Sequence, residues 1–158
     1  RMEFGPRALG NRSIFVSATD SSVNKWLNNK LKRTEFMPFA PITLDKDANK
    51  MYYNLKPIKK AVKFMTSTAK CKKAMVKSCP AAVHIDNTAR PQIIYKKSNN
   101  RIYKLLEEYK KISKNPSLIN TSFNVHEEPI VCSPDDAIRA FKTSDLDYLF
   151  INDYIVFK

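Results

Sequence analysis

The chain opens on RMEFGPRALGNRS, residues 1–13, and this stretch is the most informative part of the sequence. The only two glycines of the chain, Gly5 and Gly10, lie in it. Glycine serves where the backbone needs a positive φ or where a ligand comes close. Three of the seven arginines also fall here: Arg1, Arg7 and Arg12. Because a guanidinium binds phosphate or carboxylate through two N–H groups, we expect a tight turn that holds an anion.

A second interpretation of the opening segment stays open. Glu3 can hold one of the arginines in a salt bridge, and the cluster would then be a structural ion pair within a turn. The segment is not a P-loop, because the pattern Gly-x4-Gly-Lys-Ser/Thr is absent from it.

The rest of the chain alternates between short strands and helices. Helix signals are clearest at 100–113, where apolar residues follow the 3.6-residue period, and after Ser133, where a capping residue precedes Pro134 and two acids. We also expect a helix after Asp20 or Ser21, a short polar helix within 45–60 and a lysine-rich helix ending near Lys77. Strands are expected within 13–17, 33–44, 62–66, 80–86, 91–95, 117–120, 147–151 and 154–157, with a turn at 87–90.

This order of elements predicts an α/β (α+β) fold with a twisted, mixed open sheet and flanking helices. The 158 residues fit one domain, and the 43% hydrophobic content suffices for a packed core. No apolar run approaches the roughly 18–20 residues of a membrane span. No targeting segment is visible, so we expect a cytoplasmic protein, cut from a longer one.

The net charge of +13 is unevenly distributed. Residues 50–114 carry 17 basic and 3 acidic groups, whereas residues 115–158 carry 3 and 7. Such a basic block attracts polyanions, nucleic acid among them. Alternatively, these charges are solvated surface lysines, since 21 of the 28 basic residues are Lys.

Metal and thiol chemistry find little support in the sequence. Two histidines, His84 and His126, stand at no metal-ligand spacing. The cysteines are odd in number and match neither a zinc pattern nor a disulfide framework: Cys71, Cys79 and Cys132. We expect no metal site within these residues and a reducing compartment.

Five motifs, in order along the chain, resemble one family. The opening segment is similar to the signature R-M-E-x-G-P-R-A-L-G-x-R-S of the carbamoyltransferase family that includes nodulation protein NodU and antibiotic O-carbamoyltransferases. The other four motifs are Phe36-Met-Pro-Phe-Ala-Pro41, His84-Ile-Asp-Asn-Thr-Ala-Arg-Pro-Gln92, Leu118-Ile-Asn-Thr-Ser-Phe-Asn-Val-His126, and Glu128-Pro-Ile-Val131 with Ser133-Pro-Asp-Asp-Ala137. Together they span residues 1–137 of the chain.

The resemblance implies that residues 1–158 are the C-terminal, YrdC-like domain of such a carbamoyltransferase. Its first strand and helix, and an iron-binding, actin-like N-terminal domain, would lie outside the sequence. The domain would combine ATP, brought with Mg²⁺, and carbamoyl phosphate into carbamoyl adenylate. The N-terminal domain of the same protein would then pass the carbamoyl group to a hydroxyl acceptor. We expect no membrane partner and no nucleic-acid partner.

By matching motif positions, the resemblance also implies which residues act. Arg7, Arg90 and Ser122 would be catalytic. Bound ATP and carbamoyl phosphate would be held by those three residues with Arg12, Lys30, Lys32, Arg33 and Asn120. Each assignment has a structural alternative: Asn120 and Ser122 would satisfy a strand-end turn, Arg90 would pair with Asp86, and the lysines would form an exposed helix end.

Three positions depart from the family pattern. Glu127 and Asn87 stand where members usually have glycine, and Met37 stands where many have arginine. Asn tolerates a positive φ better than Glu does, so the change at 87 is the milder one. The histidines are ambiguous: His84 is expected as a satisfied core or sheet-face residue, and His126 fits either a structural or an acid–base role. Two alternatives to the catalytic domain are a basic nucleic-acid-binding module and a non-catalytic domain that stabilises a partner.

Overall fold

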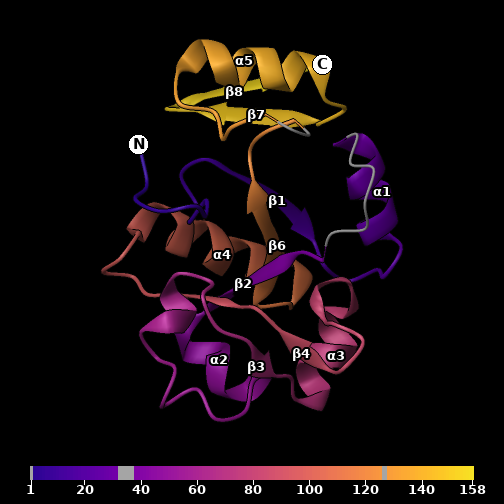
Figure 1. Cartoon of the computed structure of the whole chain (residues 1–158), viewed down its shortest axis with the longest axis vertical. Helices are drawn as coiled ribbons and strands as arrows, with labels where there is room; N and C mark the ends of the chain where they lie inside the picture. Colours follow the sequence, from indigo (N-terminus) through magenta and orange to yellow (C-terminus); the bar gives the residue numbers. More distant parts are fainter. Residues whose placement is uncertain (1, 32–37, 126–127) are drawn as a thin grey trace.

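A central four-stranded sheet organises the protein, whose computed structural model describes residues 2–31, 38–125 and 128–158 (Figure 1). Its strands run in the order β1 (Ser13–Ser17), β6 (Ser117–Ser122), β2 (Ala40–Leu44) and β5 (Gln92–Ile94). Strand β6 is antiparallel to both β1 and β2, whereas β2 and β5 are parallel. The predicted class, a mixed open sheet with flanking helices, is therefore confirmed.

Each face of the sheet is covered by a separate apolar cluster. Alternate strand residues point to opposite faces, so Leu118 faces one way and Ile119 the other. On the Leu118 face, helix α4 (Asn100–Ser113) packs Ile102 and Leu106 onto the sheet. On the Ile119 face lies the larger cluster, which includes Leu27 of helix α1 (Val23–Lys30). Each fully buried leucine of this kind contributes about 1.5–3 kcal/mol.

Local capping explains where the two best-patterned helices begin. The Asn99 side chain accepts a hydrogen bond from the Ile102 N–H at the start of α4. Helix α5 (Pro134–Thr143) starts on a reciprocal capping box between Ser133 and Asp136. These caps satisfy N–H groups that have no partner within a helix. Both helices match their predictions.

The lower part of Figure 1 holds the short elements of the basic middle of the chain: helices α2 (Asp45–Met51) and α3 (Lys73–Ser78) and the strand pair β3 (Ala69–Lys70) and β4 (Thr88–Ala89). Two predicted strands are wrong. Residues 62–66 lie in the 3-10 helix Ala61–Lys63 and a turn with a positive φ at Met65. Residues 80–86 hold the 3-10 helix Pro80–Ala82, and the predicted turn at 87–90 contains β4.

The C-terminal segment, residues 134–158, consists of one helix and a two-stranded hairpin. Helix α5 lies over the antiparallel hairpin of β7 (Tyr148–Ile151) and β8 (Tyr154–Phe157) (Figure 1). The hairpin is a separate two-stranded sheet in the described structure. Among the described residues, no helix combines the length and apolar character that a membrane span requires.

Both glycines of the opening segment have a positive φ, +101° at Gly5 and +120° at Gly10. A Cβ on Gly10 would come within 3.0 Å of Ile102 Cγ1, so this position is also crowded by α4. Asn87 adopts a φ of 61°, which fits its expected place at a glycine position. Glu127 and Met37 lie outside the described residues.

Candidate anion-binding site

The opening segment is a loop organised by Glu3. Its Oε1 accepts hydrogen bonds from the backbone N–H of Leu9 at 2.9 Å and of Asn11 at 2.8 Å. Its Oε2 forms an ion pair with Arg12 Nε at 3.2 Å, and both side chains are largely buried. Arg12 Nη1 also donates to the carbonyl oxygen of Val131 at 3.1 Å. The structural alternative for the arginine cluster is thus realised at Arg12, which holds the loop in place.

Two side-chain amides on the sheet hold this loop by hydrogen bonds. Asn120 on β6 and Gln92 on β5 point to the same face, because they lie opposite Ala40 and Ile42 of the intervening β2. Asn120 Nδ2 donates to the Ala8 carbonyl at 3.2 Å and to Gln92 Oε1 at 2.6 Å. Gln92 Nε2 donates in turn to the Leu9 carbonyl at 2.8 Å. The two amides therefore fix the backbone that immediately follows Arg7.

One atom of this network lacks a partner. Asn120 is only 2% exposed, and its buried Oδ1 has no hydrogen-bond donor. Turning the Asn120 amide over would not satisfy it, because an oxygen would then face both the Ala8 carbonyl and Gln92 Oε1. A buried acceptor without a donor costs roughly 1–3 kcal/mol. An N–H or O–H group would recover that energy only once this buried oxygen became accessible.

Arg7 and Arg90 are the second feature of the site. Arg7 is exposed, and Arg90 is half-buried between β4 and β5. Burial lowers the pKa of Arg90, and the nearby positive charge of Arg7 lowers that pKa further. Two guanidiniums that repel each other in this way are stabilised by an anion placed between them.

The other described arginines differ from this pair. Arg12 pairs with Glu3, Arg101 with Asp153 and Arg139 with Asp136. The described structure places no acidic partner on Arg7 or Arg90. The predicted alternative partner of Arg90, Asp86, accepts hydrogen bonds from Thr88 instead, which lower the pKa of that carboxyl.

Ser122 lies on the same face of β6 as Asn120, two residues further along. Its Oγ donates to Asn124 Oδ1 at 2.6 Å, and Asn124 Nδ2 donates to the Val125 and Glu128 carbonyls at 3.0 Å. Ser122 therefore takes part in the turn that follows the strand, as its structural alternative predicts. Its hydroxyl oxygen still has acceptor capacity beyond this bond.

Lys30 is engaged elsewhere. Its Nζ donates to the Asp145 carbonyl at 2.5 Å, lies 3.7 Å from Asp147 Oδ1 and stands 4.5 Å above the Trp26 ring. These contacts tie α1 to the C-terminal segment. Lys32 and Arg33, the other two candidates in this stretch, lie outside the described residues, as does His126.

His84 does not lie on a strand. Its Nδ1 is 3.0 Å from Thr88 Oγ1 and its backbone N–H donates to the Thr88 carbonyl, so it belongs to the turn before β4. The expectation of a satisfied histidine is met by Thr88 rather than by a sheet face. Gln92 belongs to the site although it is not among the residues predicted for it. A polar residue in an otherwise apolar strand, directly after the Arg90-Pro91 motif, is the signal that points to it.

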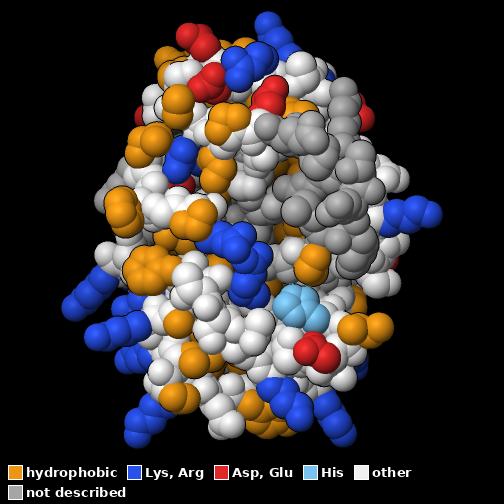
Figure 2. Space-filling model, in the orientation of Figure 1, with side chains coloured by type: hydrophobic (Ala, Val, Ile, Leu, Met, Phe, Trp, Pro, Cys, Tyr) orange, Lys and Arg blue, Asp and Glu red, His pale blue; other side chains and the backbone are white. Residues whose placement is uncertain are grey.

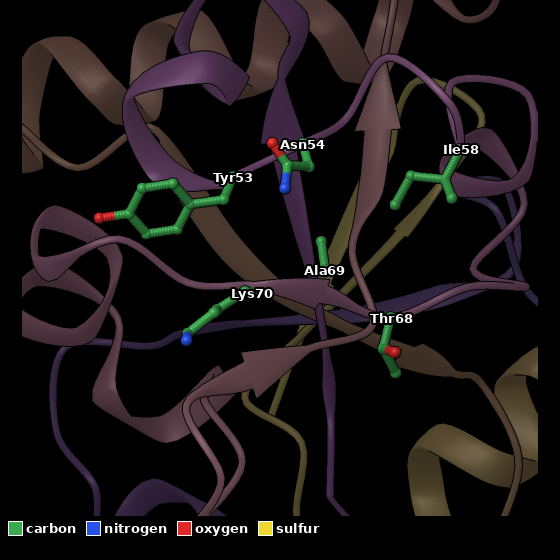
Figure 3. A pocket seen from close by; sticks show the side chains of 6 residues that line it. All are labelled: Tyr53, Asn54, Ile58, Thr68, Ala69 and Lys70. Carbon is green, nitrogen blue, oxygen red and sulfur yellow. The ribbon is translucent and has the colours of Figure 1, made fainter.

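Two hollows of the surface are lined by residues other than the two arginines. One, of about 510 Å³, is lined by Tyr53, Asn54, Ile58, Thr68, Ala69 and Lys70 (Figure 3). Another, of about 350 Å³, lies at the C-terminal segment around Leu146 and Tyr148. Figure 2 shows basic side chains gathered near the middle of one face, and others projecting from its lower edge. The chemistry of the arginine pair and Asn120, rather than the depth of a pocket, therefore defines the candidate site.

Metal-binding side chains do not cluster in the described part of the chain. No group of three or more His, Cys, Asp or Glu residues is positioned there to hold an ion. Cys71 and Cys79 are buried and Cys132 is exposed, and all three are free thiols. Burial raises the pKa of Cys71 to about 12.

Comparison with known proteins decides the family. The family model described as "Carbamoyltransferase C-terminus" matches residues 1–158. This chain is a member of the carbamoyltransferase C-terminal family. An uncharacterised protein of Methanocaldococcus jannaschii is 41% identical over 158 residues, which are 100% of this chain and 30% of that protein. Nodulation protein NolO of Bradyrhizobium diazoefficiens is 38% identical over 159 residues, covering 100% of this chain and 29% of its own length.

Nodulation protein U of Rhizobium tropici is 34% identical over 158 residues, with 100% of this chain and 26% of that protein covered. This member of the carbamoyltransferase C-terminal family thus spans less than a third of each of these relatives. A solved structure, full-length HypF in a phosphate- and nucleotide-bound form, superimposes with a TM-score of 0.58 at 22% identity. The match covers 87% of this chain and 17% of the HypF chain and supports the predicted fold.

Proposed function

We propose that this domain forms carbamoyl adenylate from ATP and carbamoyl phosphate. For the atoms to balance, water splits the P–O bond of carbamoyl phosphate, which releases inorganic phosphate and leaves carbamate. A carbamate oxygen then forms a bond to the α-phosphorus of ATP, and the bond from that phosphorus to pyrophosphate breaks. Such a displacement needs positioning and cationic stabilisation of spread charge rather than a side-chain nucleophile.

The observation that carries the proposal is the Arg7–Arg90 pair. Burial and, to a smaller extent, the charge of Arg7 lower the pKa of Arg90, and neither arginine has an acidic partner in the described structure. Phosphate oxygens are the ligands that an arginine fork fits best. Arg7 and Arg90 would hold the phosphates of ATP, and the charge they supply would stabilise the departing pyrophosphate.

Asn120 and Ser122 extend the proposal to the carbamoyl group. A carbamoyl or carbamate nitrogen carries two N–H donors, and Asn120 Oδ1 is an acceptor without a donor. Ser122, two residues along β6, would accept a further hydrogen bond from the same ligand. Mg²⁺ would arrive with ATP and be held mainly by phosphate oxygens.

Transfer to a final hydroxyl acceptor would take place on another part of the longer protein. We propose an iron-binding, actin-like N-terminal domain for that step, following the resemblance of the motifs. Choice of the acceptor would then be a property of that part.

Equilibrium titration of Mg-ATP into the protein tests the assignment of the site. Charge-assisted hydrogen bonds contribute about 1.5–3 kcal/mol each, so Arg7→Ala and Arg90→Ala should each weaken ATP binding roughly 10- to 150-fold. Arg139→Ala, an exposed arginine paired with Asp136, is the matched control and should leave binding unchanged. Equal ATP affinity in all four proteins would refute the site.

One observation favours a second candidate function, the binding of nucleic acid. Nine lysines and no acidic residue lie between Ala48 and Ile85, and Tyr53 and Lys70 line the hollow in this part of the molecule (Figure 3). Nucleic-acid binding there would weaken steeply with salt and would respond to Lys70→Glu. Binding at the arginine pair would respond to Arg7→Ala instead. Titration of a labelled single-stranded oligonucleotide at two salt concentrations separates the two functions.

A further inference from the structure

The β7–β8 hairpin presents an apolar face that nothing in the described structure covers. The cross-strand pairs Tyr148–Phe157 and Phe150–Ile155 lie on one face, because alternate strand residues share a face. These four residues are 66%, 72%, 64% and 57% exposed, respectively. Leu149, on the opposite face, is buried in the cluster that contains Ala140 and Phe141 of α5.

This exposure is unusual for a protein surface. Isolated apolar residues are common on surfaces, but adjacent large ones form patches that mark interaction sites. Neither strand of the hairpin contains a charged residue. A two-stranded sheet is also marginal on its own and offers unpaired backbone groups along its edges. The exposed face of the hairpin therefore has the composition of a protein interior that lacks a packing partner.

Polar contacts hold the hairpin in place, so the bare face has a defined position. Arg101 of α4 pairs with Asp153 in the hairpin turn at 3.5 Å. Lys30 of α1 lies 3.7 Å from Asp147, just before β7. Lys158, just after β8, donates to the Ser144 carbonyl. Three polar contacts thus link the hairpin to α1, to α4 and to the end of α5, and no described residue covers its apolar face.

We infer that this face is covered by the polypeptide that precedes the domain in full-length members of the family. The family model describes a C-terminus, and 70% or more of each reported relative lies outside the match. The opening segment lies beside the base of α5, because Arg12 holds Glu3 and also donates to the Val131 carbonyl. A chain that enters through the opening segment therefore arrives beside the α5–hairpin unit.

The chemistry of the face also fits an occupant within the same polypeptide. Permanent interfaces are more apolar than transient ones and resemble a domain core cut in half. An uncharged face of three aromatic rings and an isoleucine has that character. The preceding polypeptide would supply an apolar strand or helix to it.

The first measurement uses this chain and its double variant Phe150→Ser, Phe157→Ser. Both side chains are mostly exposed, so the variant should fold, and far-UV circular dichroism checks that it does. Sedimentation velocity should find a monomer in both proteins. A dimer of the parent chain that the variant abolishes would overturn the inference, because a second copy would then be the occupant.

The second measurement is hydrogen exchange on the full-length Methanocaldococcus jannaschii relative and on its segment that matches this chain, once far-UV circular dichroism has shown that the isolated segment is folded. Amides of the segment that aligns with β7–β8 should exchange about tenfold or more slowly in the full-length protein. Amides that align with the interior of α4 should exchange equally in both and serve as the control. Equal exchange of the hairpin in the two proteins would also overturn the inference.

Discussion

Replacing Gln92 with leucine is the sharpest test of the network beneath the opening loop. The change removes the 2.6 Å bond from Asn120 Nδ2 and the 2.8 Å bond to the Leu9 carbonyl. It leaves the Leu9 carbonyl without its side-chain donor and Asn120 with one of its two bonds. At about 1–3 kcal/mol for each group left unsatisfied, and with some gain from the added apolar surface, we expect a net loss of about 2–4 kcal/mol.

Urea unfolding measures this loss. With an m-value of about 1–3 kcal/mol/M, the midpoint of Gln92→Leu should fall by about 1–2 M. The variant should also bind Mg-ATP more weakly, because the loop that follows Arg7 loses an anchor. Unfolding at the parent midpoint, with unchanged ATP affinity, would refute the reasoning.

Gln92→Glu is the matched control. It keeps the acceptor for Asn120 Nδ2 but places a buried carboxyl oxygen against the Leu9 carbonyl. Burial would raise the folded-state pKa of this carboxyl above its unfolded value of about 4.3. The stability of Gln92→Glu relative to the parent should therefore be highest below that pH and should fall as the pH rises. A loss of unfolding free energy that does not depend on pH would contradict the assigned orientation of the Gln92 amide.

Three further predictions follow from single residues. Gly10→Ala should destabilise the protein by about 1–3 kcal/mol in urea unfolding, because a Cβ would sit 3.0 Å from Ile102 Cγ1 at a φ of +120°; unchanged stability would contradict the loop conformation. A thiol reagent at pH 8 should label Cys132 alone, since Cys71 is buried with its pKa raised to about 12; fast labelling of further thiols before unfolding would be the contrary result. Hydrogen bonds lower the pKa of Asp136, so its contribution to stability is present above the unfolded pKa of about 3.9 and is lost as pH falls through the folded pKa. The difference in unfolding free energy between the parent and Asp136→Asn should therefore shrink on acidification. A difference that stays constant with pH would contradict this prediction.

Local signals explain which elements the sequence predicts well. Helix α5 follows from Ser133 and Asp136 alone, because a capping box is a contact between residues three apart. The strands predicted at 62–66 and 80–86 are wrong because a short apolar run does not distinguish a strand from a helical segment. At Met65 a positive φ ends any extended backbone, and no residue type within 62–66 predicts it.

The candidate site divides in the same way. Arg7 and Arg90 could be chosen from their motifs, although 83 residues separate them in the sequence. Whether Arg12 or Arg7 pairs with Glu3 could not be decided, because the choice depends on how the loop folds back onto Val131. Gln92 was missed for a similar reason: its role depends on the Leu9 carbonyl, which reaches it only once β5 and the loop are in place.

Release of pyrophosphate from Mg-ATP, with and without carbamoyl phosphate, tests the central claim most directly. We predict release that requires carbamoyl phosphate, is lost in Arg7→Ala and Arg90→Ala, and persists in Arg139→Ala. Release that is independent of carbamoyl phosphate, or equal in all four proteins, would contradict the account. So would the absence of both pyrophosphate release and Arg7-dependent binding of ATP.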